Sequence, residues 1–294
     1  MLVGPVVHRA WEITRHYKGL WVLGAFAGAA PTFAYQWQMS RDPSSSSLGF
    51  ANLLTTANTI LVLILLSLGV LTVILHLICS AALVDAVNRL ARTGVYRLGA
   101  SFSAGFDYFW RFLGLLLMNF LASIVLILLI GLPAALMFLA GTSIGFFSLI
   151  VFVPIGVVGF LSLFCIYELA RRAVVMRGIS IGDGVEEAWY LFRHNLATNA
   201  QLTLIVFGLT LAMVLIFIVI IGLAVAPFVT LALVPHFGFI LALILGIPVL
   251  FLVLVLFNGF SGAFLSAIYT LFYFELLQMG DSVTFSLPQE SGNS

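Results

Sequence analysis

Residues 198–226 read TNAQLTLIVFGLTLAMVLIFIVIIGLAVA and contain no charged side chain. About 20 apolar residues suffice for a helix to cross the hydrocarbon core of a bilayer. The apolar run is continuous, whereas the strands of a membrane β-barrel alternate apolar and polar residues. The segment is therefore predicted to be a transmembrane helix.

The whole chain of 294 residues shares this character. It is 63% hydrophobic and only 8% charged, with a mean hydropathy of +1.21. A soluble domain is about 45–50% apolar and about 25% charged. No compact fold of this size hides so much apolar surface from water, so the surrounding medium must be lipid. The composition excludes a soluble enzyme, a nucleic-acid-binding protein and a disordered chain.

The sequence predicts an all-α, polytopic membrane protein with six transmembrane helices. Tracts 112–167 and 194–274 are free of Asp, Glu, Lys and Arg, and each is long enough for two crossings and a turn. Gly246 and Pro248 interrupt the last helix, and because proline removes a backbone donor we expect a bend there. The predicted spans are residues 19–38, 58–84, 113–139, 145–168, 198–226 and 239–272.

The basic residues orient these spans. Of the twelve Lys and Arg residues, all but Arg41 fall on the same side of the six predicted helices. Lys and Arg accumulate in the cytoplasmic loops of membrane proteins. Both termini are therefore predicted to be cytoplasmic.

A different kind of segment precedes the fifth span. Residues 180–196 read SIGDGVEEAWYLFRHNL, with Ser180 and Asp183 spaced as in a helix N-cap. Its apolar residues recur at helical spacing, which predicts an amphipathic helix along the cytoplasmic interface. The apolar stripe consists of Ile181, Val185, Ala188, Trp189 and Phe192.

Two earlier segments align with this one. Ser101 placed under Ser180 brings Trp110 under Trp189, and Trp11 placed under Trp189 brings Arg15 under Arg193. The further stripe residues are Phe102, Phe106, Phe109 and Leu113 in the second segment and Val3, Val7 and Ala10 in the first. We expect Trp11, Trp110, Trp189, Arg15 and Arg193 to lie at the interface and to face lipid.

The alignment predicts a threefold internal repeat of one amphipathic helix followed by a transmembrane hairpin. The predicted copies cover residues 2–94, 100–178 and 179–280, and Gly94, Gly178 and Gly280 are expected to end their last helices. Equally oriented copies are related by an axis along the membrane normal. The copies form one transmembrane domain over 1–280, followed by a disordered cytoplasmic tail over 281–294.

The segment before the fifth span resembles one found in prokaryotic membrane proteins similar to the membrane domain of glycerophosphoryl diester phosphodiesterases. That family pattern is Ser-apolar-x-x-x-apolar-x-x-Ala-Trp-x-apolar-x-Arg, which Ser180 to Arg193 follows. Residues 101–111 match it in part, and residues 10–15 match its second half. The resemblance implies a multi-helix domain in a prokaryotic plasma membrane. The catalytic domain of the phosphodiesterases has no counterpart here, so no catalytic activity is implied.

Polar residues within the predicted spans are few. The candidates for an intramembrane polar site are His76, Asn119, Glu168, Gln201 and Asn258. For His76, Asn119, Gln201 and Asn258, hydrogen bonds between helices are the simpler role, and a substrate or proton site is the alternative. Glu168 is followed by Arg171 and Arg172, so an ion pair at the interface is its simpler role and a gate or partner contact is the alternative. Cys79 and Cys165 lack the spacing of a metal or redox motif, so we expect buried, inert thiols.

No catalytic, cofactor-binding or metal-binding motif stands out in the chain. The sequence therefore predicts a non-enzymatic membrane protein without a cofactor. Its expected partners are membrane lipids and other membrane-protein subunits. A transporter or channel for a small solute or lipid, with a cavity on the pseudo-threefold axis, is the alternative.

Overall fold

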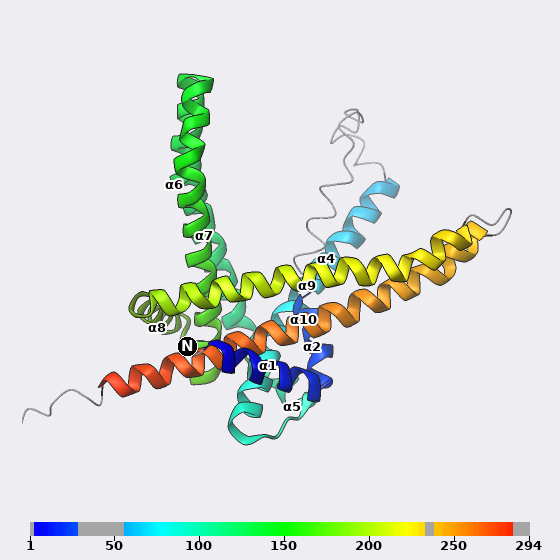
Figure 1. The fold of residues 1–294 in the computed structure, drawn as a ribbon, viewed down its shortest axis with the longest axis horizontal. Coiled ribbons are helices and arrows are strands. Elements are labelled where there is room, and N and C mark those ends of the chain that lie inside the picture. The colour runs from blue at the N-terminus through cyan, green and yellow to red at the C-terminus, as the bar shows by residue number, and fades with distance from the viewer. Residues whose placement is uncertain (1–2, 29–55, 233–237, 285–294) are drawn as a thin grey trace, which may run out of the picture. The chain divides into compact units, whose positions relative to one another are not determined.

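The computed structural model describes residues 3–28, 56–232 and 238–284. These ranges contain nine helices and no strand (Figure 1), as the predicted all-α class requires. The helices are α1 (Val3–His16), α2 (Gly19–Gly28), α4 (Thr56–Thr93), α5 (Leu98–Asp107), α6 (Phe109–Ala140), α7 (Thr142–Arg177), α8 (Ile181–His194), α9 (Leu196–Ala232) and α10 (Gly238–Thr284).

Within the described ranges, five helices are long and apolar enough to cross a membrane. They lie at five of the six positions predicted for spans, so the sequence pattern identified them correctly. The sixth prediction, over 19–38, coincides with α2 up to Gly28, and residues 29–38 lie outside the described residues. The five segments are Leu66–Thr93, Phe109–Leu139, Gly145–Arg177, Leu196–Ala232 and Phe239–Gln278.

The long helices extend beyond their apolar cores. Helix α4 continues to Thr93 and α7 to Arg177, about nine residues past the predicted ends. Charged residues do not stop a helix, and basic ones near its C-terminus favour it. Helices α4 and α7 each end at the residue before a glycine. Gly94 and Gly178 both adopt the left-handed conformation, with φ of +68°, which is the usual way for a glycine to end a helix.

Helix α10 is continuous from Gly238 to Thr284. It runs through Gly246 and Pro248, in keeping with the tolerance of transmembrane helices for proline, and the bend expected there stays a prediction. It also continues through Gly280, so the expected helix end at that glycine is wrong. The first four residues of the predicted tail, 281–284, are helical, and residues 285–294 lie outside the described residues.

Two of the short helices are closely equivalent. Helices α1 and α8 have 14 residues each, and both limits of α8 fall 178 positions after those of α1. In each helix the last residue is a histidine whose Nδ1 lies near the carbonyl oxygen four residues earlier, at 3.0 Å in His16 and 2.9 Å in His194. Each is followed within two residues by the next helix.

Helix α5 departs from this pattern. It has only 10 residues and begins after Arg97, which makes no side-chain cap. Ser101 lies inside the helix and is buried, whereas Ser180 is the N-cap of α8. The predicted equivalence of Ser101 and Ser180 as helix starts is therefore wrong, because an N-cap serine must precede its helix.

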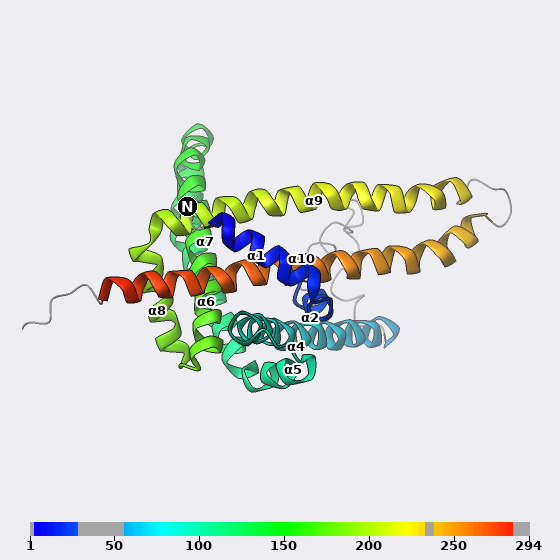
Figure 2. The ribbon, with the colours of Figure 1, turned by 60° about the horizontal axis from the view of Figure 1, so that its bottom comes forward.

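The chain divides into two compact units by its internal contacts. One consists of Met1–Arg9, Trp110–Phe207 and Ile268–Ser294, and the other of Ala10–Phe109 and Gly208–Ala267. In the first, α6 and α7 lie side by side as an antiparallel hairpin, drawn in green in Figures 1 and 2, and α8 packs on α7. In the second, α4 packs against α2 and α5.

The second unit contains a close crossing of α2 and α10. A Cβ atom added to Gly24 would lie 2.1 Å from the carbonyl oxygen of Gly259, and one added to Gly262 would lie 2.6 Å from that of Gly24. Small residues allow such approaches between membrane helices. Trp21 and Trp11 cover the crossing with edge-to-face contacts to Phe260, at 5.5 and 5.4 Å.

The cap of α8 provides a local test of the fold. The backbone N–H of Asp183 donates to Ser180 Oγ at 3.3 Å, and Ser180 Oγ donates to Asp183 Oδ2 at 2.7 Å. Loss of an N-cap side chain costs about 1 kcal/mol. The Ser180→Ala variant should therefore show about fivefold faster hydrogen exchange in the first turn of α8. Ser101→Ala is the matched control, and equal exchange in Ser180→Ala and the wild type would contradict the cap.

Candidate functional site

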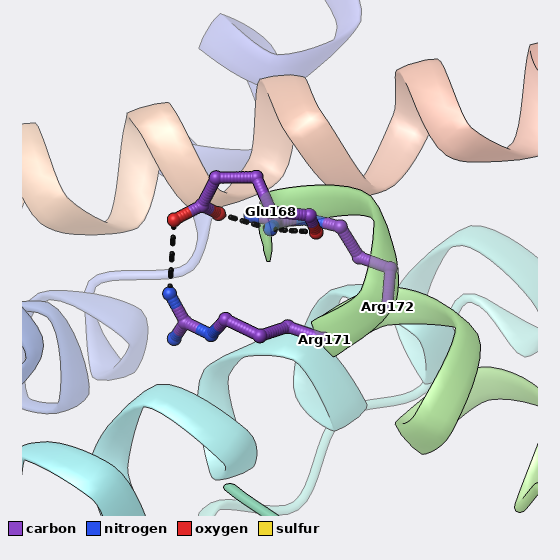
Figure 3. Close-up of polar contacts among 3 residues, drawn as sticks. All are labelled: Glu168, Arg171 and Arg172. Atoms are coloured by element: carbon purple, nitrogen blue, oxygen red, sulfur yellow. Dashed lines mark hydrogen bonds and ion pairs between the residues drawn. The ribbon is translucent and has the colours of Figure 1, made fainter. Parts of the chain in front are cut away.

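A buried ionic cluster lies near the C-terminal end of α7. Arg171 Nη1 is 3.0 Å from Glu168 Oε1, and Arg172 Nη1 pairs with Glu168 Oε2 and with the Glu168 carbonyl oxygen. Figure 3 shows the two guanidinium groups reaching the carboxylate from opposite sides. The residues lie three and four positions apart, which places them on one helix face. We call Glu168, Arg171 and Arg172 the ionic cluster.

Aromatic rings enclose the ionic cluster. The guanidinium of Arg171 lies 5.0 Å from the ring centroid of Phe112 on α6 and 5.3 Å from that of Tyr167. The guanidinium of Arg172 lies 5.0 Å from the ring centroid of Tyr269 on α10. Such cation–π contacts stabilise a desolvated cation. The side chain of Arg172 is only 2% exposed, so its charge depends on Glu168 and these rings.

A second polar group links α7, α8 and α10 in the same unit. Arg177 Nη1 lies 2.9 Å from Glu187 Oε1, and the Tyr273 hydroxyl donates to the same oxygen at 2.6 Å. Arg111 at the start of α6 donates to the carbonyl oxygen of Gly178 at 3.0 Å. Arg177 of α7, Glu187 of α8 and Tyr273 of α10 are thus linked by charge-assisted hydrogen bonds, and Arg111 links α6 to the residue that follows α7.

Residues of α7, α8 and α9 line an apolar groove. Its volume is about 580 Å³. Its walls include Val158 and Leu161 from α7 and Leu204 and Phe207 from α9, and Phe192 comes from α8. All its lining residues belong to one compact unit. This volume is in the range typical of small-molecule binding sites.

The five predicted interfacial residues lie on the short helices or at the start of a long one. All five residues are exposed. Trp11 and Arg15 lie on α1, Trp189 and Arg193 on α8, and Trp110 near the start of α6, and the two arginines stand in the last turns of their helices. On α8 the buried residues are Gly184, Ala188 and Leu191. The predicted stripe therefore matches the buried face only at Ala188 and is displaced toward Trp189.

The five intramembrane polar candidates come from five different helices. Glu168 is buried, Gln201 is exposed, and the remaining three are half-buried. Asn119 and Asn258 each accept a hydrogen bond at the backbone carbonyl, from Ser123 Oγ at 2.8 Å and Ser261 Oγ at 3.3 Å. His76 and Asn258 belong to the second compact unit, and Asn119, Glu168 and Gln201 belong to the first.

Sequence reasoning identified Glu168 but missed the aromatic part of the cluster. Tyr269 and Tyr273 lie one helical turn apart near the C-terminal end of the last span, and this spacing places them on one face of the helix. Nothing in the sequence relates that face to Arg172. The groove was also missed, because a void between two apolar helices has no sequence pattern.

The two thiols are buried, as the sequence predicted. Cys79 and Cys165 are free and buried, and Cys165 Sγ lies 3.1 Å from Thr203 Oγ1. Among the described residues, no three His, Cys, Asp or Glu side chains gather as a metal site would require.

Comparisons of the chain with protein-family models, curated proteins and solved structures find no match. The resemblance to the membrane domain of glycerophosphoryl diester phosphodiesterases stays a prediction from the short Ser180–Arg193 segment.

Proposed function

We propose that this helical membrane protein is a non-enzymatic module that binds lipids or other membrane subunits within a larger assembly. The observation that carries the proposal is the position of the exposed tryptophans. Trp11 lies on the 14-residue helix α1, Trp189 lies on the 14-residue helix α8 that precedes the long helix α9, and Trp110 lies at the start of a span. Tryptophan concentrates at membrane interfaces, where such residues contact headgroups or a neighbouring protein.

The arrangement of polar side chains supports the same function. The buried charges of α7 pair with one another in the ionic cluster, and Glu187 is paired with Arg177 and Tyr273. The long helices instead present apolar side chains, such as Leu129, Phe147 and Leu223, which are exposed. Surfaces of this kind are solvated by lipid or covered by other membrane helices.

The threefold repeat is part of this proposal. Helices α1 and α8 have equal lengths and correspond at both ends, which supports equivalence of the first and third copies. We propose that the three short helices α1, α5 and α8 form a collar on the cytoplasmic side of a prokaryotic plasma membrane, and that both termini lie on the cytoplasmic side. A collar of this kind offers one continuous face for headgroups or partner subunits.

Two measurements on the full-length protein test the proposed function. Purification from native membranes in mild detergent, followed by mass spectrometry, should recover defined lipids or partner polypeptides. Proteoliposomes of the same protein should release glycerol, amino acids and K⁺ no faster than protein-free liposomes. A monodisperse protein that retains neither lipid nor partner and accelerates solute release would be a transporter or channel, which would overturn the proposal.

A further inference from the structure

The groove along α7 and α9 has the chemistry of a site for an apolar chain. Its walls are formed chiefly by aliphatic and aromatic side chains, among them Val157, Val158, Leu161, Leu204 and Phe207. Both wall helices contain spans that are long and apolar enough to cross a membrane. The medium next to the groove is therefore the acyl region of the bilayer.

The polar groups of the groove already have hydrogen-bond partners. Ser162 Oγ donates to the Val158 carbonyl and Thr203 Oγ1 to the Asn199 carbonyl, each at 2.8 Å. Asn199 Nδ2 donates to the Asn195 carbonyl at 3.0 Å. Since these donors are used within the protein, a polar solute would lose its hydrogen bonds to water without replacement. The groove therefore favours an apolar occupant.

Two basic residues are neighbours in the chain of residues that line the groove. Phe192 and Leu196 line the groove, and between them in the chain stand Arg193 and His194, both exposed. They form the last turn of α8. A basic side chain beside the membrane surface attracts an anionic headgroup. The positive charge next to these lining residues thus complements a phosphate group attached to the apolar occupant.

We propose that this groove holds an acyl chain of an anionic phospholipid, taken from the leaflet at the basic ends of the helices. The inference rests on the proposed function and names its ligand class. The chain lies between α7 and α9, and the headgroup lies beside Arg193.

Photo-crosslinking identifies the occupant. A benzophenone amino acid at Ala200, which lines the groove, is irradiated in full-length protein after purification in mild detergent. The matched control carries the same group at Ala212, which is exposed on α9 and does not line the groove. The expected result is a phospholipid adduct at 200 and none at 212, where detergent has replaced bulk lipid. An adduct at 200 with this chain, a second copy or another polypeptide would overturn the proposal.

Filling the groove provides a second test. Native mass spectrometry should detect one fewer retained phospholipid in Ala200→Trp than in Ala212→Trp, with both variants monodisperse and equal in melting temperature. Equal lipid retention would contradict the groove assignment. If lipid retention is equal in the two variants and Ala200→Trp also recovers the partners of the wild type, the groove assignment fails while the proposed function stands.

The headgroup preference has its own readout. The protein is reconstituted in vesicles that contain equal amounts of phosphatidylglycerol and phosphatidylcholine, and the lipids retained after extraction are compared. Arg193→Gln should lower the ratio of retained phosphatidylglycerol to phosphatidylcholine about fivefold. An unchanged ratio would overturn the anionic part of the proposal.

Discussion

Replacement of Glu168 by glutamine should lower the free energy of unfolding by about 3–5 kcal/mol. The change leaves Arg172 almost completely buried, with a side chain that is 2% exposed, and removes the carboxylate that offsets its charge. A buried charge without its partner cannot recover the hydration it loses on folding. The measurement is titration of the purified protein from mild detergent into SDS, followed by circular dichroism.

The control uses another ion pair with the same sequence spacing. Asp85 accepts from Arg89 at 2.7 Å, but the side chain of Arg89 is 47% exposed, so water can solvate it when the partner is lost. Asp85→Asn should cost no more than about 1 kcal/mol. Combining Glu168→Gln with Arg172→Met should recover only part of the loss, because position 172 then carries no buried charge while Arg171, 12% exposed, still lacks its carboxylate partner. Equal effects of Glu168→Gln and Asp85→Asn would contradict a desolvated cluster.

Gly24→Ala should destabilise the protein by about 1–3 kcal/mol. The added methyl group would lie 2.1 Å from the Gly259 carbonyl oxygen and 2.7 Å from the Ala263 backbone nitrogen. Backbone atoms cannot rotate away as a side chain does, so α2 and α10 must separate. The loss is measured by the same SDS titration.

The same substitution elsewhere should have the opposite sign. A Cβ at Gly69 on α4 would meet nothing within 4 Å, and alanine is favoured over glycine inside a helix by about 0.5–1 kcal/mol. Gly69→Ala should therefore be neutral or stabilising. A Gly24→Ala variant as stable as Gly69→Ala would show that the two helices do not cross closely.

The helices follow from the sequence because their signals are local. Apolar tracts without charge identify α6, α7, α9 and α10, and glycine in the left-handed conformation ends α4 and α7. The end at Gly280 was wrong, because a glycine terminates a helix only where the chain needs that conformation. The spacing of Ser180 and Asp183 likewise identified the start of α8.

The sites depend on contacts between distant segments, and these are harder to infer. The spacing of Glu168, Arg171 and Arg172 predicts an ion pair, but their burial depends on Phe112 and Tyr269 from other helices. The Ser101 alignment failed for a related reason. A shared serine and tryptophan do not specify which residue is the N-cap of the helix. In α5 the N-cap is Arg97 rather than Ser101.

The proposed function requires the three short helices to lie on one side of the membrane. The direct measurement is labelling of single cysteines with a membrane-impermeant maleimide in intact cells and in opened membranes. The positions are Arg9 on α1, Gly99 on α5, Glu186 on α8 and Thr142 at the start of α7, all exposed. We predict labelling of Thr142→Cys alone in intact cells and of all four in opened membranes. Labelling of the α1, α5 or α8 cysteine in intact cells would contradict the common cytoplasmic collar.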